Sequence, residues 1–165
     1  MPSGEAIRVF NEFLNGLQRL NLKVYIVSGN HDSKERLNFA SGLLSHLNFH
    51  IASFLETKVF KDSIDENVDI YMIPFLRPAD VRTLLNTDVK EYEESFRKMV
   101  DLINLDSSKF NILVSHQFFT FSGLEPEKSD SEIFSVGSLD NIDVSAVDEF
   151  DYVALGHIHR PQYIE

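Results

Sequence analysis

Five side chains in this sequence are of the types that bind divalent metals and transfer protons: Asn30, His31, His116, His157 and His159. Neutral imidazole is the commonest side-chain ligand of metals. The amide oxygen of asparagine is a hard, neutral ligand suited to Mn²⁺ or Mg²⁺. A histidine that binds no metal can protonate a leaving oxygen as a general acid. Together these residue types predict a metal-dependent phosphoester hydrolase, provided that the fold brings them to one place.

Each of the five comes just after an apolar, strand-like run, and the three runs are residues 24–27, 112–114 and 152–155. Open α/β sheets bind their ligands at the carboxyl ends of their strands. We therefore expect the three runs to deliver the imidazole and amide groups to one edge of a sheet.

Each of these residues also has a simpler explanation. Gly29-Asn30-His31-Asp32 has the composition of an ordinary turn, and a single histidine after a strand is most often a hydrogen-bonded structural residue. Two features favour chemistry: the turn directly follows a buried strand, and Gly156 precedes two histidines spaced by two residues. Extended backbone over 157–159 would place both imidazoles on one side, where they could serve adjacent metals. His46 and His50 lack such a setting and are expected to be structural or exposed.

The elements that must position these residues can be read from apolar periodicity. Helices are predicted over 4–20, 34–47, 78–86 and 90–105. Strands are predicted over 23–28, 49–53, 57–61, 68–74, 110–114 and 151–155. Ser33 is expected to cap the second helix, Pro78 suits the first turn of the third, and 120–142 is expected to be a loop. The alternation predicts one α/β domain over 1–165, with helices on both sides of the sheet.

Composition limits the function further. The chain has 165 residues, 43% of them hydrophobic and 25% charged, which is ordinary for a globular domain. Its net charge of −11 argues against a broad basic surface for nucleic acid, so a protein of this kind that cuts DNA would need metal ions, another domain or a partner. With no cysteine, any metal must have N and O ligands. No secretory signal or membrane span is evident, and we expect a cytoplasmic protein without membrane contact.

Four segments carry a resemblance to a known family: 28–33 (SGNHDS), 73–78 (IPFLRP), 129–132 (SDSE) and 151–162 (DYVALGHIHRPQ). They resemble the calcineurin-like metallophosphoesterases, and among these the SbcD-type exonuclease subunits. The resemblance covers nearly the whole chain. It implies part of a β-sandwich flanked by helices, in four α/β/β/α layers, truncated at both ends.

The resemblance also implies roles for individual residues. Asn30, His116 and His157 would bind one Mn²⁺ ion and His159 a second, with Mg²⁺ as another candidate. His31 would assist the leaving group without binding metal, and Asp32 would orient the loop.

Partners follow from the same resemblance. Family members act on double-stranded DNA ends and hairpins, in repair and recombination, together with an SbcC-like SMC-type ATPase. The apolar stripe of 34–47, most simply explained as core packing, could instead be the contact of a homodimer.

One departure from the family is large. Its Asp-x-His and Gly-Asp-x-x-Asp motifs, which supply the carboxylates of the metal centre, have no match in this sequence. We therefore expect an internal piece of an SbcD-like domain that binds at most one metal weakly and is inactive alone. Two alternatives stay open: a phosphoesterase for small substrates, and a non-catalytic dimerisation or docking module.

Overall fold

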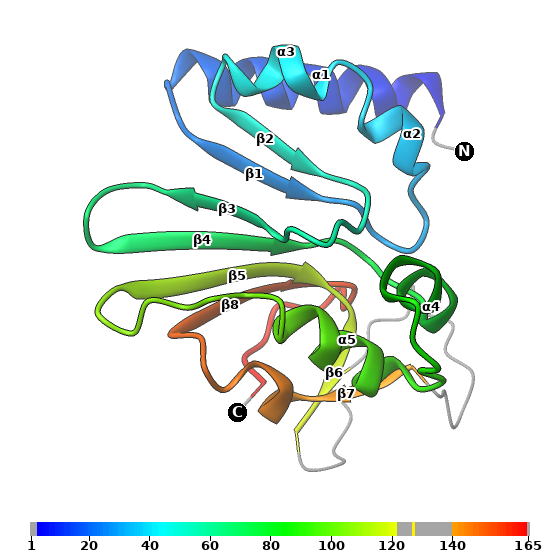
Figure 1. Ribbon diagram of the computed structural model, residues 1–165. Helices are drawn as coiled ribbons and strands as arrows, with labels where there is room; N and C mark the ends of the chain where they lie inside the picture. Colours follow the sequence, from blue (N-terminus) through cyan, green and yellow to red (C-terminus); the bar gives the residue numbers. More distant parts are fainter. Residues whose placement is uncertain (1–2, 122–126, 128–139, 165) are drawn as a thin grey trace.

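The computed structural model describes residues 3–121, 127 and 140–164 (Figure 1). Two sheets lie at its centre. In the smaller one, β1 (Val24–Val27) runs parallel to β2 (Phe49–Ala52). The larger one has the order β3-β4-β5-β8, with bounds Phe60–Ser63, Val68–Ile73, Phe110–His116 and Tyr152–Gly156. Only the β3–β4 pairing of this sheet is antiparallel.

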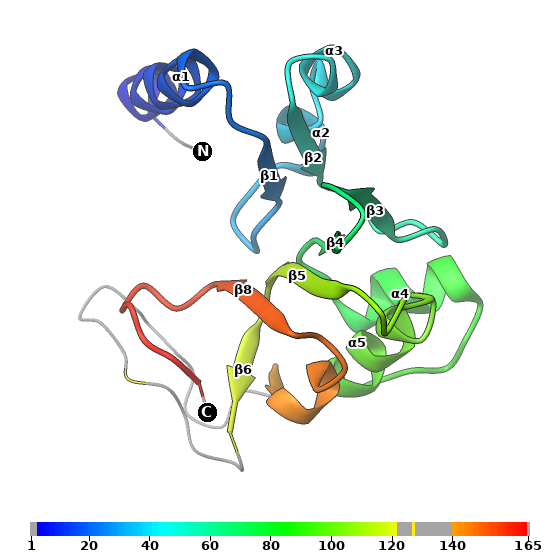
Figure 2. The same cartoon turned by 90° about the vertical axis from the view of Figure 1, so that its left-hand side faces the viewer.

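The helices form the outer layers. They are α1 (Gly4–Arg19), α2 (Lys34–Leu37), α3 (Ser41–Ser45), α4 (Pro78–Leu85) and α5 (Tyr92–Val100). Figure 2 shows α1 and α3 outside the β1–β2 pair and α4 and α5 beyond the larger sheet. This arrangement is the α/β/β/α order implied by the family resemblance, so the predicted fold class is confirmed. No helix in the described ranges is both long and apolar enough to cross a bilayer.

The hydrophobic core lies between the larger sheet and its helices. Its largest fully buried apolar side chains are Tyr71, Met72, Ile73, Leu76, Met99, Leu113, Phe96 and Phe119. By contrast, α1 buries none of its residues, and Ile7 and Phe13 on its apolar stripe are 56% and 59% exposed. The periodicity of 4–20 therefore predicted the helix correctly, but this apolar stripe does not contribute to the core.

The predicted helix over 34–47 is wrong as a single element. Ser33 does cap α2, accepting a hydrogen bond from the Arg36 N–H, but the helix ends at Leu37. Ala40 then adopts φ 60°, a left-handed conformation that interrupts the helical hydrogen bonding, and α3 starts anew at Ser41. Phe39 and Leu43 are 81% and 73% exposed, so core packing of this stripe is also wrong.

Other boundaries differ from those predicted. The helix expected over 90–105 is confined to α5, and the strand expected over 57–61 is β3, which begins at Phe60. Two short strands were not predicted: β6 (Phe118–Thr120) pairs in parallel with β7 (Asn141–Asp143) at the edges of the expected loop. A 3₁₀ helix, η1 (Val144–Val147), follows β7. The 129–132 segment lies outside the described residues.

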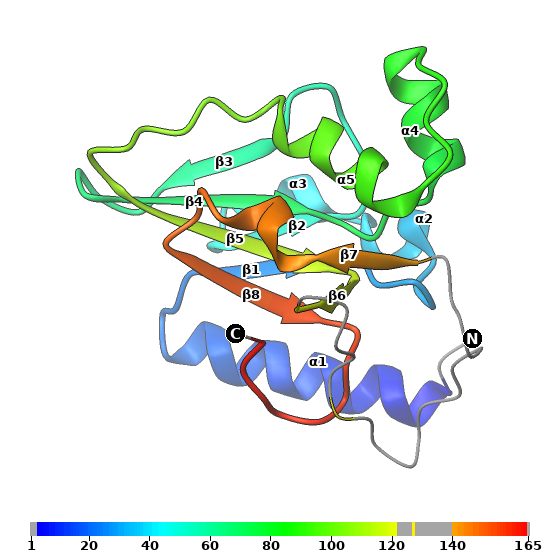
Figure 3. The same cartoon turned by 90° about the horizontal axis from the view of Figure 1, so that it is seen from below.

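The three strands that lead to the predicted site residues, β1, β5 and β8, end at the same side of the molecule. Figure 3 shows β5 and β8 side by side with their arrowheads at one edge, and Figure 1 shows β1 ending at the same side of the molecule. The Phe75 N–H donates to the Ser28 carbonyl at 2.8 Å, which ties the segment after β4 to the end of β1. The carboxyl ends of β1, β5 and β8 are therefore brought together as predicted, with the end of β4 beside them. The expectation of one sheet edge is wrong, because β1 belongs to the smaller sheet and the ends meet across two sheets.

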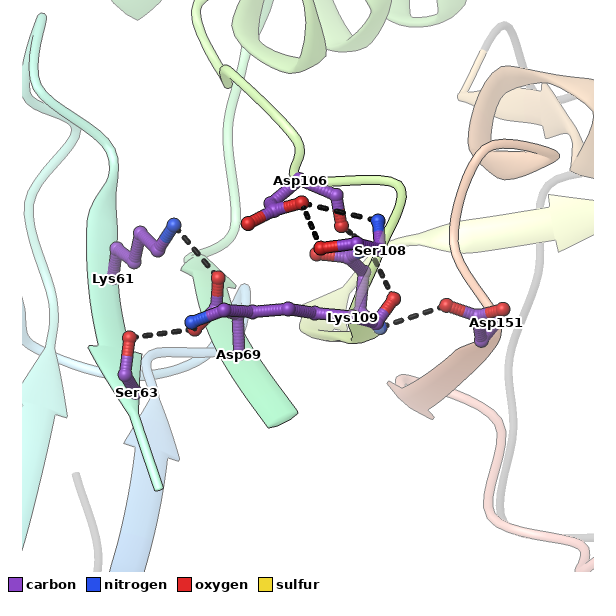
Figure 4. Close-up of polar contacts among 8 residues, drawn as sticks. Lys61, Ser63, Asp69, Asp106, Ser108, Lys109 and Asp151 are labelled. Atoms are coloured by element: carbon purple, nitrogen blue, oxygen red, sulfur yellow. Dashed lines mark hydrogen bonds and ion pairs between the residues drawn. The ribbon is translucent and has the colours of Figure 1, made fainter. Parts of the chain in front are cut away.

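A polar cluster fixes the opposite end of the larger sheet (Figure 4). The Asp69 carboxylate is fully buried, and the ammonium groups of Lys61 and Lys109 lie 2.7 and 3.2 Å from its oxygens. Ser63 donates a hydrogen bond to the same carboxylate. These hydrogen bonds lower the pKa of Asp69 to about 2, and the hydrogen bond from Lys61 has the largest effect. The cluster joins β3 and β4 to the residue that precedes β5.

Asp69→Asn is expected to destabilise the fold by about 2–3 kcal/mol at neutral pH, because both lysines lose their counter-charge. A carboxyl with a lowered folded-state pKa stabilises above its unfolded pKa near 4 and loses that contribution as the pH falls toward 2. Urea unfolding at pH 7 and pH 3 should therefore show a smaller difference from the unmodified chain at pH 3. Asp88→Asn, at an exposed carboxylate, is the matched control. An equal effect of both variants would contradict this role for Asp69.

Candidate metal centre

The His116 imidazole lies between the backbones of two glycines, Gly29 just after β1 and Gly156 at the end of β8. A Cβ atom added at Gly29 would stand 2.7 Å from His116 Cε1, and one added at Gly156 would stand 2.6 Å from His116 Nδ1. Both distances are shorter than carbon and nitrogen atoms tolerate without displacement. In the β5–β8 register, His116 is paired directly with Gly156. Glycine is thus required at both positions because the ring occupies the space of a side chain.

Asn30 supplies the second polar group of the site. Its Oδ1 atom lies 3.2 Å from His116 Nε2. Two neighbouring ligands about 2.1 Å from one octahedral ion stand about 3 Å apart, so this spacing fits a pair that shares a divalent cation. The amide oxygen is a ligand that Mn²⁺ and Mg²⁺ both accept, whereas the imidazole nitrogen favours Mn²⁺ over Mg²⁺.

The loop that carries Asn30 is held by its own backbone and by Asp32. The Asp32 carboxylate accepts a hydrogen bond from the Gly29 N–H at 2.7 Å, and the Asp32 N–H donates to the Gly29 carbonyl. Ser28, the residue before Gly29, is fully buried, and its hydroxyl donates a hydrogen bond to the Ser53 carbonyl. These contacts turn the chain sharply after β1, with Asn30 directed at His116 and His31 exposed.

His157 also lies against His116. The two ring centroids are 5.3 Å apart with the planes nearly perpendicular, and the Phe118 ring lies 5.8 Å from His157. The predicted extended backbone over 157–159 is wrong, because β8 ends at Gly156 and His157 has φ 87°. A positive φ is uncommon for a residue with a side chain and costs free energy, and such strain tends to occur at functional sites.

Burial keeps His116 in the form that binds metal. The pKa of His116 is lowered to about 4, chiefly by burial and then by the charges of His157, His31 and His159, with the Asp32 carboxylate partly offsetting the shift. The ring is therefore neutral at physiological pH, as a metal ligand must be. His31 and His159 are exposed, so they lie at the rim of the site, close enough to influence His116 electrostatically.

The structure thus brings Asn30, His116 and His157 together and leaves His31 and His159 around them. Within the described part of the chain, no three His, Asp or Glu side chains converge in a way that could hold a metal. Of the two remaining histidines, His50 stacks on Tyr25 at 5.1 Å and His46 is exposed, as expected.

Sequence reasoning did not find two residues that support the site. The Phe75 ring meets His116 edge-on at 6.3 Å, and the fully buried Gln117 donates its side-chain N–H to the Leu76 carbonyl at 3.1 Å. They hold the segment after β4 against the end of β5. The two prolines that bracket this segment, Pro74 and Pro78, were the available signal that its backbone is rigid.

Comparison with known sequences identifies the family. The sequence model of the calcineurin-like phosphoesterases matches residues 3–161. The chain belongs to this family. It is also similar to a subunit of the nuclease SbcCD from Staphylococcus epidermidis (strain ATCC 12228 / FDA PCI 1200), with 29% identity over 165 residues. That alignment covers 97% of this chain and 43% of the relative, so the chain spans less than half the length of that protein.

In this calcineurin-like phosphoesterase, Gly156→Ala is expected to displace the His116 ring and to lower stability by about 1–3 kcal/mol through overpacking. Urea unfolding measures the loss, and the ¹⁵N chemical shifts of the imidazoles report the displacement. Gly16→Ala is the control, because a Cβ at that position in α1 meets no atom within 4 Å. A Gly156→Ala protein with unchanged stability and unchanged His116 shifts would show that the ring is not confined as described.

Proposed function

We propose that this chain is the histidine-bearing part of a Mn²⁺-dependent nuclease subunit of SbcD type, which hydrolyses phosphodiester bonds at the ends and hairpins of double-stranded DNA. The observation that supports this most strongly is the 3.2 Å approach of Asn30 Oδ1 to His116 Nε2, with His157 packed beside them. The family match and the similarity to a relative named as part of the nuclease SbcCD point to the same chemistry.

In this proposal, Asn30, His116 and His157 hold one ion and His159 contributes to a second, with Mg²⁺ as an alternative to Mn²⁺. When bound, a pair of such ions supplies charge neutralisation and activation of the attacking water in phosphoester hydrolysis. His31, exposed at the tip of the loop, donates a proton to the leaving oxygen. Asp32 keeps that loop folded through its hydrogen bond from Gly29.

The charge of the ligand set limits what the isolated chain can do. An amide and neutral imidazoles bring no negative charge, whereas hard divalent cations prefer carboxylate oxygen. We therefore infer that the 165-residue chain binds one Mn²⁺ ion weakly and hydrolyses DNA poorly by itself.

The partners proposed for the whole protein follow from the relative. Its name makes it one component of SbcCD, and we infer that this protein works in the cytoplasm with an SbcC-like SMC-type ATPase in DNA repair, recombination and replication. The net charge of −11 supports the need for such a partner, because a polyanion gains little from the surface of this chain alone.

A homodimer through 34–47 is a second proposal, supported by exposure of the apolar side chains of that segment. Phe39, Leu43 and Leu47 are 81%, 73% and 53% exposed. Burial of such side chains between two copies is favourable by about 25 cal/mol per Å² of apolar surface. If 34–47 is the interface, Leu43→Glu will convert a dimer to a monomer in light scattering, whereas Ile64→Glu, on another exposed apolar residue, will not.

Titration of the purified chain with Mn²⁺ tests the metal site. We expect one weak site that is lost in both His116→Ala and His157→Ala but kept in His46→Ala, which removes an exposed histidine outside the site. Binding that survives both substitutions would contradict the proposal.

Turnover separates the alternatives for the whole protein. If the whole protein is a nuclease of this type, we expect it to cut hairpin DNA in preference to small phosphodiesters. A preference for small substrates would favour another phosphoesterase, and metal-independent dimerisation without turnover would favour a docking module.

A further inference from the structure

A hollow of about 300 Å³ lies beside the metal centre. It is lined by residues of the loop after β1, by the first two residues of α2, by Phe75 and Arg77 from the segment after β4, and by Asp80 of α4. Asn30 belongs both to the hollow and to the metal centre, so the hollow directly adjoins the centre.

Two cations line this hollow, and only one is already paired. The Lys34 ammonium lies 3.1 Å from the Asp80 carboxylate, which neutralises both groups. The Arg77 side chain is exposed and makes no hydrogen bond or ion pair with any residue that the structure describes. The other carboxylates at the rim are engaged: Asp32 accepts from the Gly29 N–H, and Glu35 accepts from the Ser33 hydroxyl.

The backbone that carries Arg77 is fixed on both sides of the residue. The Phe75 N–H donates to the Ser28 carbonyl, and Gln117 holds the Leu76 carbonyl. The Arg77 carbonyl accepts from the Asp80 and Val81 N–H groups at the start of α4. An arginine held in this way places its guanidinium with little loss of backbone entropy on binding, and the planar guanidinium matches the geometry of phosphate.

We propose that Arg77 binds a phosphate of the DNA backbone next to the one held at the metal centre, and so favours a polynucleotide over an isolated phosphoester. This inference rests on the proposed function, since it takes DNA as the substrate. It adds a binding residue on the 73–78 segment, where the sequence offered only a family likeness.

The test is DNA binding by the full chain, measured as fluorescence anisotropy of a labelled blunt-ended duplex over a range of salt concentrations, with Mn²⁺ and with EDTA. Arg77→Ala is expected to weaken binding about tenfold at low salt and to reduce the slope of log affinity against log salt by about one. Arg77→Lys should retain the slope because it keeps the positive charge. It should recover only part of the affinity, because an ammonium group cannot donate the two parallel hydrogen bonds of a guanidinium to phosphate.

Arg19→Ala is the matched control. It removes the same charge from an exposed position in the last turn of α1, which lies at the far end of the molecule from the strand ends (Figure 1), and should change affinity less than about twofold. Duplexes with and without 5′-phosphates should respond alike, because Arg77 contacts an internal phosphate. Equal effects of Arg77→Ala and Arg19→Ala, an effect confined to 5′-phosphorylated ends, or no DNA binding in either buffer would overturn the inference.

The two proposals fail in different ways. If Arg77→Ala binds Mn²⁺ as the unmodified chain does but DNA binding is unaffected, the Arg77 inference fails and the metal site stands. If DNA binding depends on Arg77 in EDTA while the chain binds no Mn²⁺, the metal site fails and only the contact between Arg77 and a DNA phosphate stands.

Discussion

The contact on which the site depends is the insertion of one imidazole between two strand-end backbones. His116 fits only because Gly29 and Gly156 lack side chains. Its imidazole fills the space between the chain just after β1 and the end of β8, so that only this ring separates the two backbones. From that position its neighbours follow: Asn30 at Nε2, with the His157 and Phe75 rings packed nearly perpendicular to the imidazole. Burial in this packing also keeps the imidazole neutral.

That packing requires the strands to be in register, and the polar cluster at the opposite end of the sheet contributes to it. A buried carboxylate is unfavourable without partners, so Asp69 on β4 is stable only where Lys61 from β3 and Lys109 beside β5 both reach it. Across β5, the Asp151 carboxylate accepts from the Asn111 N–H just before β8 begins. A shift of β3, β4 or β5 against its neighbour would separate the charges around Asp69, and a shift between β5 and β8 would move Gly156 away from His116.

The meeting of Asn30, His116 and His157 could be predicted in part, because each residue lies at or just after the carboxyl end of a strand that pairs in parallel. The sequence did not show that β1 belongs to a separate sheet, or that Gly29 and Gly156 make room for the His116 ring. The role of Asp69 could not be predicted, since an aspartate near a strand end reads as a surface residue and its burial depends on lysines 8 and 40 positions away. The positive φ values of Ala40 and His157 were missed for a related reason. Nothing in the local sequence demands them, and they are set by how the chain packs around α3 and His116.

The most direct test of this account is a crystal structure of the chain grown with Mn²⁺, with anomalous scattering collected at the manganese edge. The account predicts an anomalous peak in contact with both Asn30 Oδ1 and His116 Nε2, the two atoms that already lie 3.2 Å apart. A peak bound elsewhere, or ordered Asn30 and His116 side chains at saturating Mn²⁺ with no peak between them, would contradict the metal centre described here.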